Sequence, residues 1–262
     1  LCLSLFGAAD LQTHRLPFTS MLAYGFGQVS ESIKNVGFST FLLFYYNQVL
    51  HVSATGTGIA LAIALVFDAV SDPVAGGLSD KLRSRWGRRH PFILMAAVPL
   101  AITFYLLFNP PAELSELGNI LWLLTFAVLV RGSMTFYHVP HLALGAELAP
   151  DYHQRSSLYA LNTFFGYMGG AIFVPLSYVL FFPTTEAFNP GLLNKDAYTP
   201  WSIAAGGIMV FAIVVCCLGT AREIPRLRQQ SESRPAGKFG MVRLLLEVRD
   251  ALYNKSFRAI FF

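Results

Sequence analysis

The chain has 262 residues, of which 54% are hydrophobic and only 13% carry a charge. This composition is typical of a membrane protein and excludes an ordinary water-soluble domain. The formal net charge is +4, and the basic residues bracket apolar runs, so they indicate membrane topology rather than nucleic-acid binding. Cys216 and Cys217 are adjacent inside one apolar run, which argues against a disulfide framework.

Residues 1–19 are predicted to form a cytoplasmic segment before the first membrane crossing. Residues 1–9 are apolar but too short to cross, and no charged region or cleavage site marks them as a signal peptide. The sequence starts with Leu1 and ends inside an apolar segment, so we expect it to be part of a longer protein.

Six apolar runs are long enough to cross a bilayer as helices, because a helix rises about 1.5 Å per residue. The predicted crossings cover residues 20–50, 55–79, 92–109, 117–144, 157–182 and 201–221. We therefore predict an all-α membrane protein in which residues 20–221 form a six-helix transmembrane bundle. Residues 222–255 are predicted to be a cytoplasmic linker, and residues 256–262 the start of a truncated seventh helix.

The loops between the predicted crossings alternate in charge. The loop after the second crossing is strongly basic and contains Lys81, Arg83, Arg85, Arg88 and Arg89. Arg155 follows the fourth crossing, and the stretch after the sixth crossing is basic throughout, whereas residues 51–54 and 110–118 contain no Lys or Arg. By the positive-inside rule, both ends of the chain are expected in the cytoplasm, which agrees with an even number of crossings.

Five ionisable residues fall at membrane depth: Glu31 and Lys34 in the first crossing, Asp68 and Asp72 in the second, and Arg131 in the fourth. The two aspartates lie one turn apart, about 6 Å along the axis, on the same helix face. An unpaired charge at this depth costs at least ~2.5 kcal/mol, so we expect the charges to be paired. We predict that Lys34 lies against Asp68, and that Arg131 or a bound cation balances Asp72 and Glu31.

Each of these residues has two open interpretations. The acids could couple an ion to transport, or they could belong to a structural ion-pair network between the first, second and fourth crossings. Lys34 and Arg131 could be counter-ions or substrate ligands. His138 could be a satisfied interior histidine or a proton relay. Tyr137 could be a packing residue or a platform that stacks on a sugar.

A second group of charges is predicted to form a cytoplasmic gate. Asp80 ends the second crossing and is followed by Arg88 and Arg89 in the basic loop. We expect these three residues to form a latch between helices that breaks and re-forms during transport, with Arg155 in the same gate.

Three segments resemble the glycoside–pentoside–hexuronide:cation symporters, a branch of the major facilitator superfamily. They read DAVSDP at 68–73 with RSRWGRRHPFIL at 83–94, YHVP at 137–140, and DYHQR at 151–155. The resemblance covers nearly the whole chain but only the amino-terminal half of a family member, which has twelve helices in two halves. It implies a major facilitator six-helix bundle that partners a carboxy-terminal six-helix half of the same protein.

The resemblance also implies an ion site beside the substrate site. Asp68 and Asp72 match the family's two cation-binding aspartates, which take Na⁺, Li⁺ or H⁺, so Na⁺ is the one metal expected. The family's acid on the first helix falls on Ser32, with Glu31 next to it. Lys34 would compete with Na⁺ for the carboxylates, which favours proton coupling or a weakened Na⁺ site.

The sugar contacts of the family are matched less well. The family's acid on the fourth helix falls on His138. Its sugar-stacking tryptophan falls on Leu142, and its sugar-binding arginine falls on Thr163. The resemblance therefore implies that the cation-binding acids are retained while the substrate differs from the family's best-known sugar.

The predicted function is secondary active transport in a bacterial inner membrane: symport of a sugar or glycoside with H⁺ or Na⁺ by alternating access. One alternative is a carrier of an amphipathic lipid or another organic solute on the same fold, and another is a non-transporting receptor or assembly protein. We do not expect an enzyme, because no metal-ligand spacing, nucleophile elbow or phosphate loop is present in the sequence. No resident cofactor is expected, and the lipid bilayer is the expected surrounding.

Overall fold

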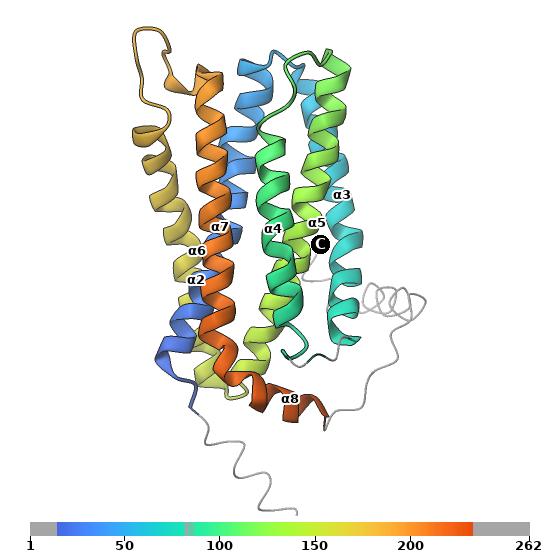
Figure 1. The fold of residues 1–262 in the computed structure, drawn as a ribbon, viewed down its shortest axis with the longest axis vertical. Helices are drawn as coiled ribbons and strands as arrows, with labels where there is room; N and C mark the ends of the chain where they lie inside the picture. Colours follow the sequence, from blue (N-terminus) through green and yellow to red (C-terminus); the bar gives the residue numbers. More distant parts are fainter. Residues whose placement is uncertain (1–14, 82–83, 85, 233–262) are drawn as a thin grey trace, which may run out of the picture.

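A computed structural model describes the backbone of residues 15–81, 84 and 86–232, without the side chains of 69–70, 80–81 and 230–232. The linker after residue 232, the predicted start of a seventh helix at 256–262, and most of the predicted amino-terminal segment lie outside these residues. Within them the chain forms a bundle of long helices that run along one common direction (Figure 1).

The helices follow the predicted crossings in order. The first crossing consists of α2 (Phe18–Val36) with the π-helical segments η1 (Gly37–Leu42) and η2 (Tyr45–Val49). The others are α3 (Ala54–Lys81), α4 (His90–Leu107), α5 (Glu116–Leu148), α6 (Tyr152–Leu180) and α7 (Tyr198–Thr220). Five of the described helices, α3 to α7, are long and apolar enough to cross a membrane. The predicted class, an all-α membrane protein, is confirmed.

The described helices form two groups that α4 and α7 join. α2 packs against α6 and α7, while α5 packs against α3 and α4. Figure 1 shows α6, α2 and α7 on one side of the bundle and α4, α5 and α3 on the other. α2 and α5 meet only along a short stretch. Polar side chains, described below, connect these two helices.

Aromatic side chains fill the core at the end of the bundle opposite α8 (Ile224–Glu232). Trp201 is completely buried, and its ring centroid lies 4.6 Å from that of Phe41 and 4.9 Å from that of Phe108. The Trp201 indole donates a hydrogen bond of 3.0 Å to the Ser177 hydroxyl. The indole N–H therefore has an acceptor, as a buried polar group requires.

Two predicted loops contain helix instead. α6 begins at Tyr152 rather than at residue 157, because Asp151 caps it: the carboxylate accepts a 3.1 Å hydrogen bond from the Gln154 amide. The predicted linker begins with α8, which lies across the end of the bundle (Figure 1). Arg226 of α8 donates to the Leu148 carbonyl at the end of α5 (2.8 Å), so this part of the linker packs on the bundle.

Candidate functional site

Asp68 and Asp72 lie one turn apart on α3, and each faces a polar side chain of α5. Arg131 forms an ion pair with Asp68, and the Thr135 hydroxyl donates a 2.8 Å hydrogen bond to Asp72. Both pairs are separated by 63 positions in the sequence. α3 and α5 therefore run parallel and in register, so residues four apart on one helix meet residues four apart on the other.

The Arg131–Asp68 pair is mostly enclosed. The side chain of Arg131 is 13% exposed and that of Asp68 is 25% exposed. The Arg131 guanidinium also lies over the ring of Phe38 in η1, with Cζ 4.9 Å from the ring centroid, a cation–π contact. Asp72, one turn along α3, is exposed. The two aspartates thus differ in their surroundings although they share a helix face.

A second set of polar contacts joins α2 to α5 and α6. Glu31 Oε2 lies 2.9 Å from His138 Nδ1, a close approach without the alignment of a hydrogen bond. Gln28 donates a hydrogen bond to Glu31, and Asn162 of α6 donates to Gln28 Oε1 (3.2 Å). Together with the two α3–α5 pairs, these contacts form what we call the polar ladder: Asp68–Arg131, Asp72–Thr135 and Glu31–His138.

The predicted pair of Lys34 with Asp68 is wrong, because Arg131 takes that carboxylate. Within the described residues Lys34 forms no ion pair, although it lies within electrostatic range of Glu31, Asp68 and Asp72. The prediction that Arg131 balances Asp72 and Glu31 is wrong for the same reason, while its alternative, a bound cation, stays a prediction. Depth along the membrane normal correctly grouped these residues, but it could not decide which of two cations at similar depth faces Asp68.

The sequence reasoning missed Thr135. Its hydroxyl lies 2.8 Å from Asp72 Oδ1 and 3.5 Å from the Ser71 hydroxyl. One signal was available, because Thr135 stands four residues after Arg131 just as Asp72 stands four residues after Asp68. The same four-residue spacing on two helices indicates facing positions only if the helices run parallel. The predicted topology implies this, since the second and fourth crossings run in the same direction.

Tyr137 belongs to the packed core, which favours the first of its two interpretations, a packing residue. It is fully buried, and its ring stacks on that of His141 at 5.2 Å and 18°. Its hydroxyl lies beside Gly27 of α2 and Cys216 of α7. Other residues of α5 form the polar ladder. Neighbouring positions on this helix therefore have different roles, one in packing and the other in the site.

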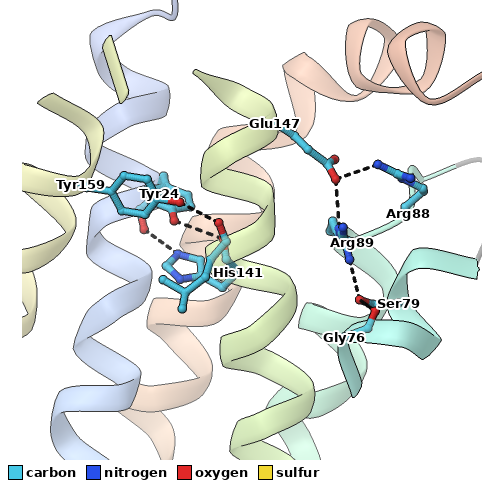
Figure 2. Close-up of polar contacts among 9 residues, drawn as sticks. Tyr24, Gly76, Ser79, Arg88, Arg89, His141, Glu147 and Tyr159 are labelled. Carbon is cyan, nitrogen blue, oxygen red and sulfur yellow. Dashed lines mark hydrogen bonds and ion pairs between the residues drawn. The ribbon is translucent and has the colours of Figure 1, made fainter. Parts of the chain in front are cut away.

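His141 of α5 contacts Tyr24 of α2 (Figure 2). The Tyr24 hydroxyl donates to the His141 carbonyl (3.1 Å), and His141 Nε2 lies 3.1 Å from the Tyr24 carbonyl. The two rings stack with centroids 4.3 Å apart. Tyr159 of α6 donates to the Leu142 carbonyl (2.9 Å). These bonds fix α5 against α2 and α6 where backbone contact is sparse.

Replacing Gly145 by Val should lower the free energy of unfolding by about 1–3 kcal/mol through overpacking. A Cβ at Gly145 would clash with the hydroxyl of Tyr24, a residue that is completely buried. Thermal melting of the purified protein in detergent measures the loss. Gly207→Ala is the control, since nothing lies within 4 Å of a Cβ there, and no loss is expected. Equal melting of Gly145→Val and the unmodified protein would contradict the packing described here.

A cluster of charges joins the ends of α3, α4 and α5 near α8 (Figure 2). Arg88 and Arg89 bind the same oxygen of Glu147, at 2.8 Å and 3.1 Å. Arg89 also donates to the Ser79 hydroxyl at 2.6 Å. We call Arg88, Arg89, Glu147 and Ser79 the Glu147 latch. The predicted latch partner, Asp80, has a side chain outside the described residues.

The sequence reasoning missed Glu147, and the predicted place of Arg155 in the gate stays a prediction. Glu147 stands in the last turn of α5 and thus at the level of the basic loop, which was the available signal. Arg155 instead donates to the Ala149 carbonyl (3.0 Å) and the Pro150 carbonyl (3.4 Å), so it caps the end of α5 and does not bind Glu147.

Helices long enough to cross a bilayer, with paired charges held between them, define a multi-pass integral membrane protein. A family model described as MFS/sugar transport protein matches residues 23–262. The chain belongs to this family of the major facilitator superfamily.

Curated relatives match part of their own length. A symporter of Synechocystis is 33% identical over 176 residues, 65% of this chain and 32% of the relative. The glucuronide carrier protein homolog of Escherichia coli is 26% identical over 219 residues, 82% of this chain and 46% of the relative. The sodium-dependent lysophosphatidylcholine symporter 1-A of Danio rerio is 27% identical over 139 residues, 53% of this chain and 26% of the relative. The chain spans less than half the length of these relatives.

Proposed function

We propose that the protein is a secondary active transporter that couples symport of a sugar or glycoside to H⁺ or Na⁺ by alternating access. The observation that carries this proposal is the polar ladder. Charged side chains between membrane-crossing helices are costly, so those that are present serve transport or a structural network. Family membership and a glucuronide carrier among the relatives support a sugar derivative as the substrate.

Within this proposal the acids of the ladder perform the coupling. Asp72 is exposed, and among the contacts described its carboxylate accepts a hydrogen bond only from a neutral hydroxyl. It can therefore bind an incoming cation. Asp68 and Glu31 are already partnered by Arg131 and His138. Arg131, Lys34 and His138 provide the compensating charge or contact the substrate.

The Glu147 latch is the proposed cytoplasmic gate. It ties the ends of three helices through one carboxylate, so opening this end of the bundle must break or rearrange its hydrogen bonds. The proposed orientation places this end, α8 and both chain ends in the cytoplasm, since the basic residues gather there. The proposed location is a bacterial inner membrane, and the proposed partner is a carboxy-terminal half of six helices.

Gradient-driven uptake tests the proposal. The full-length protein in proteoliposomes should accumulate at least one radiolabelled or chromogenic glycoside when a pH or Na⁺ gradient is imposed. Asp72→Asn should retain substrate counterflow but lose accumulation, since exchange needs binding and accumulation needs coupling. Absence of both counterflow and accumulation across a panel of glycosides would overturn the proposal and favour a non-transporting receptor.

A lipid carrier is the second candidate, which the lysophosphatidylcholine symporter among the relatives favours. The same vesicle assay with a fluorescent lysophospholipid separates the two. Saturable movement of the lipid without movement of any glycoside would select this candidate, and the reverse result would exclude it.

A further inference from the structure

The Asp68 carboxylate is a largely enclosed anion, and the protein's own Arg131 binds one of its oxygens. Asp68 Oδ2 is bound by Arg131 Nη1, while Asp68 Oδ1 is buried and has no hydrogen-bond partner. A hard cation such as Na⁺ binds through oxygen ligands and would need this carboxylate as one of them. The guanidinium therefore already neutralises the carboxylate that the metal ion would need.

Several contacts hold Arg131 in this position. Its guanidinium lies on the Phe38 ring, and its side chain is only 13% exposed, so the cation is not free to swing into water. Phe38 belongs to η1, the π-helical part of the first crossing that begins one turn after Lys34. The guanidinium of Arg131, which belongs to α5, is thus held between Asp68 of α3 and Phe38 of the first crossing.

The surrounding charges do not attract a further cation to Asp68. Lys34 of α2 lies within electrostatic range of Arg131 and Asp68. Glu31 has His138 beside it, and Asp72 accepts from the neutral Thr135. Within the described part of the chain, no three His, Cys, Asp or Glu side chains converge to hold a metal ion. A metal ion at Asp68 would meet the positive side chains of Arg131 and Lys34.

We propose that Arg131 is a tethered counter-ion that takes the place of a metal ion on Asp68, so that the protein binds Na⁺ there only when this guanidinium is removed. The proposal rests on the proposed function in one respect: it makes H⁺ the coupling ion of the same site. Arg131 thus determines ion specificity, and the exposed carboxylate of Asp72 remains for the proton.

Salt-specific thermal stability tests the proposal without any transport assay. The full-length protein in detergent is melted in 100 mM NaCl and in N-methylglucamine chloride of equal ionic strength. The unmodified protein should melt at the same temperature in both salts. Arg131→Gln should melt about 5 °C or more higher in NaCl, since an ion at many times its dissociation constant stabilises the state that binds it. Adding Asp68→Asn to Arg131→Gln should abolish this response.

Lys34→Ala is the matched control, because it removes a cation from the same region without freeing Asp68 Oδ2. It should give a clearly smaller Na⁺ response than Arg131→Gln. Arg131→Lys keeps a cation at the position and should show no response. An equal response of Lys34→Ala and Arg131→Gln would overturn the proposal, because overall charge would then explain the effect.

Two further results would also overturn it: a Na⁺-specific shift of the unmodified protein as large as that of Arg131→Gln, or no Na⁺ response of Arg131→Gln. Failure of Arg131→Gln to fold in either salt counts against the proposal, since Na⁺ should replace the lost partner. If uptake assays find no sugar transport while the Na⁺ response appears as described, the ion site stands and the substrate assignment fails.

Discussion

Replacing Asp68 by Asn should lower the free energy of unfolding by about 3 kcal/mol, because it leaves a buried guanidinium without its anion. Arg131 is 13% exposed and Asp68 is the one carboxylate it pairs with in the described part of the chain. The neutral amide can accept one hydrogen bond from Arg131 but cannot balance its charge. Thermal melting of the purified full-length protein measures the loss as a fall in melting temperature.

Two variants show whether the charge is the cause. Asp68→Asn combined with Arg131→Gln removes both charges, so it should recover most of the stability that the single variant loses. Asp72→Asn removes an acid one turn away that is exposed and accepts one neutral hydrogen bond, so it should cost less than about 1 kcal/mol. Equal losses for Asp68→Asn and Asp72→Asn would show that the Arg131 pair is not buried in the way described.

Replacing Glu147 by Gln should slow transport by opening the latch. The change removes the carboxylate that accepts from both Arg88 and Arg89. Losing charge-assisted hydrogen bonds of this kind costs about 2 kcal/mol, which changes the balance between closed and open states about 30-fold. In proteoliposomes we expect a lower maximal rate with a nearly unchanged substrate concentration at half-maximal rate, since the latch lies at the helix ends and not in the polar ladder.

Glu113→Gln is the control for this variant. Glu113 is an exposed acid in the loop at the opposite end of α5, so its loss should leave transport unchanged. Accessibility of an engineered cysteine near the end of α3 should rise in Glu147→Gln and stay constant in Glu113→Gln. If Glu147→Gln transports at the normal rate with unchanged accessibility, the latch is a static contact and not a gate.

The sequence by itself predicted the crossings, and the helices follow them in order; it also predicted the depth of each charge. Long apolar runs separated by charged loops follow directly from the cost of placing polar backbone and side chains in lipid. Position along a helix fixes depth, since each residue adds about 1.5 Å. The grouping of Glu31, Lys34, Asp68, Asp72 and Arg131 at one level therefore required no structure.

The tertiary structure decided which of these residues face each other. Rotation of each helix about its axis depends on packing against all its neighbours, and this turned Arg131 toward Asp68 and placed Tyr137 in the core. It also brought Glu147 to the two arginines of a loop 58 and 59 positions away in the sequence. A periodic pattern defines a face of a helix, but only the packed bundle determines what lies opposite that face.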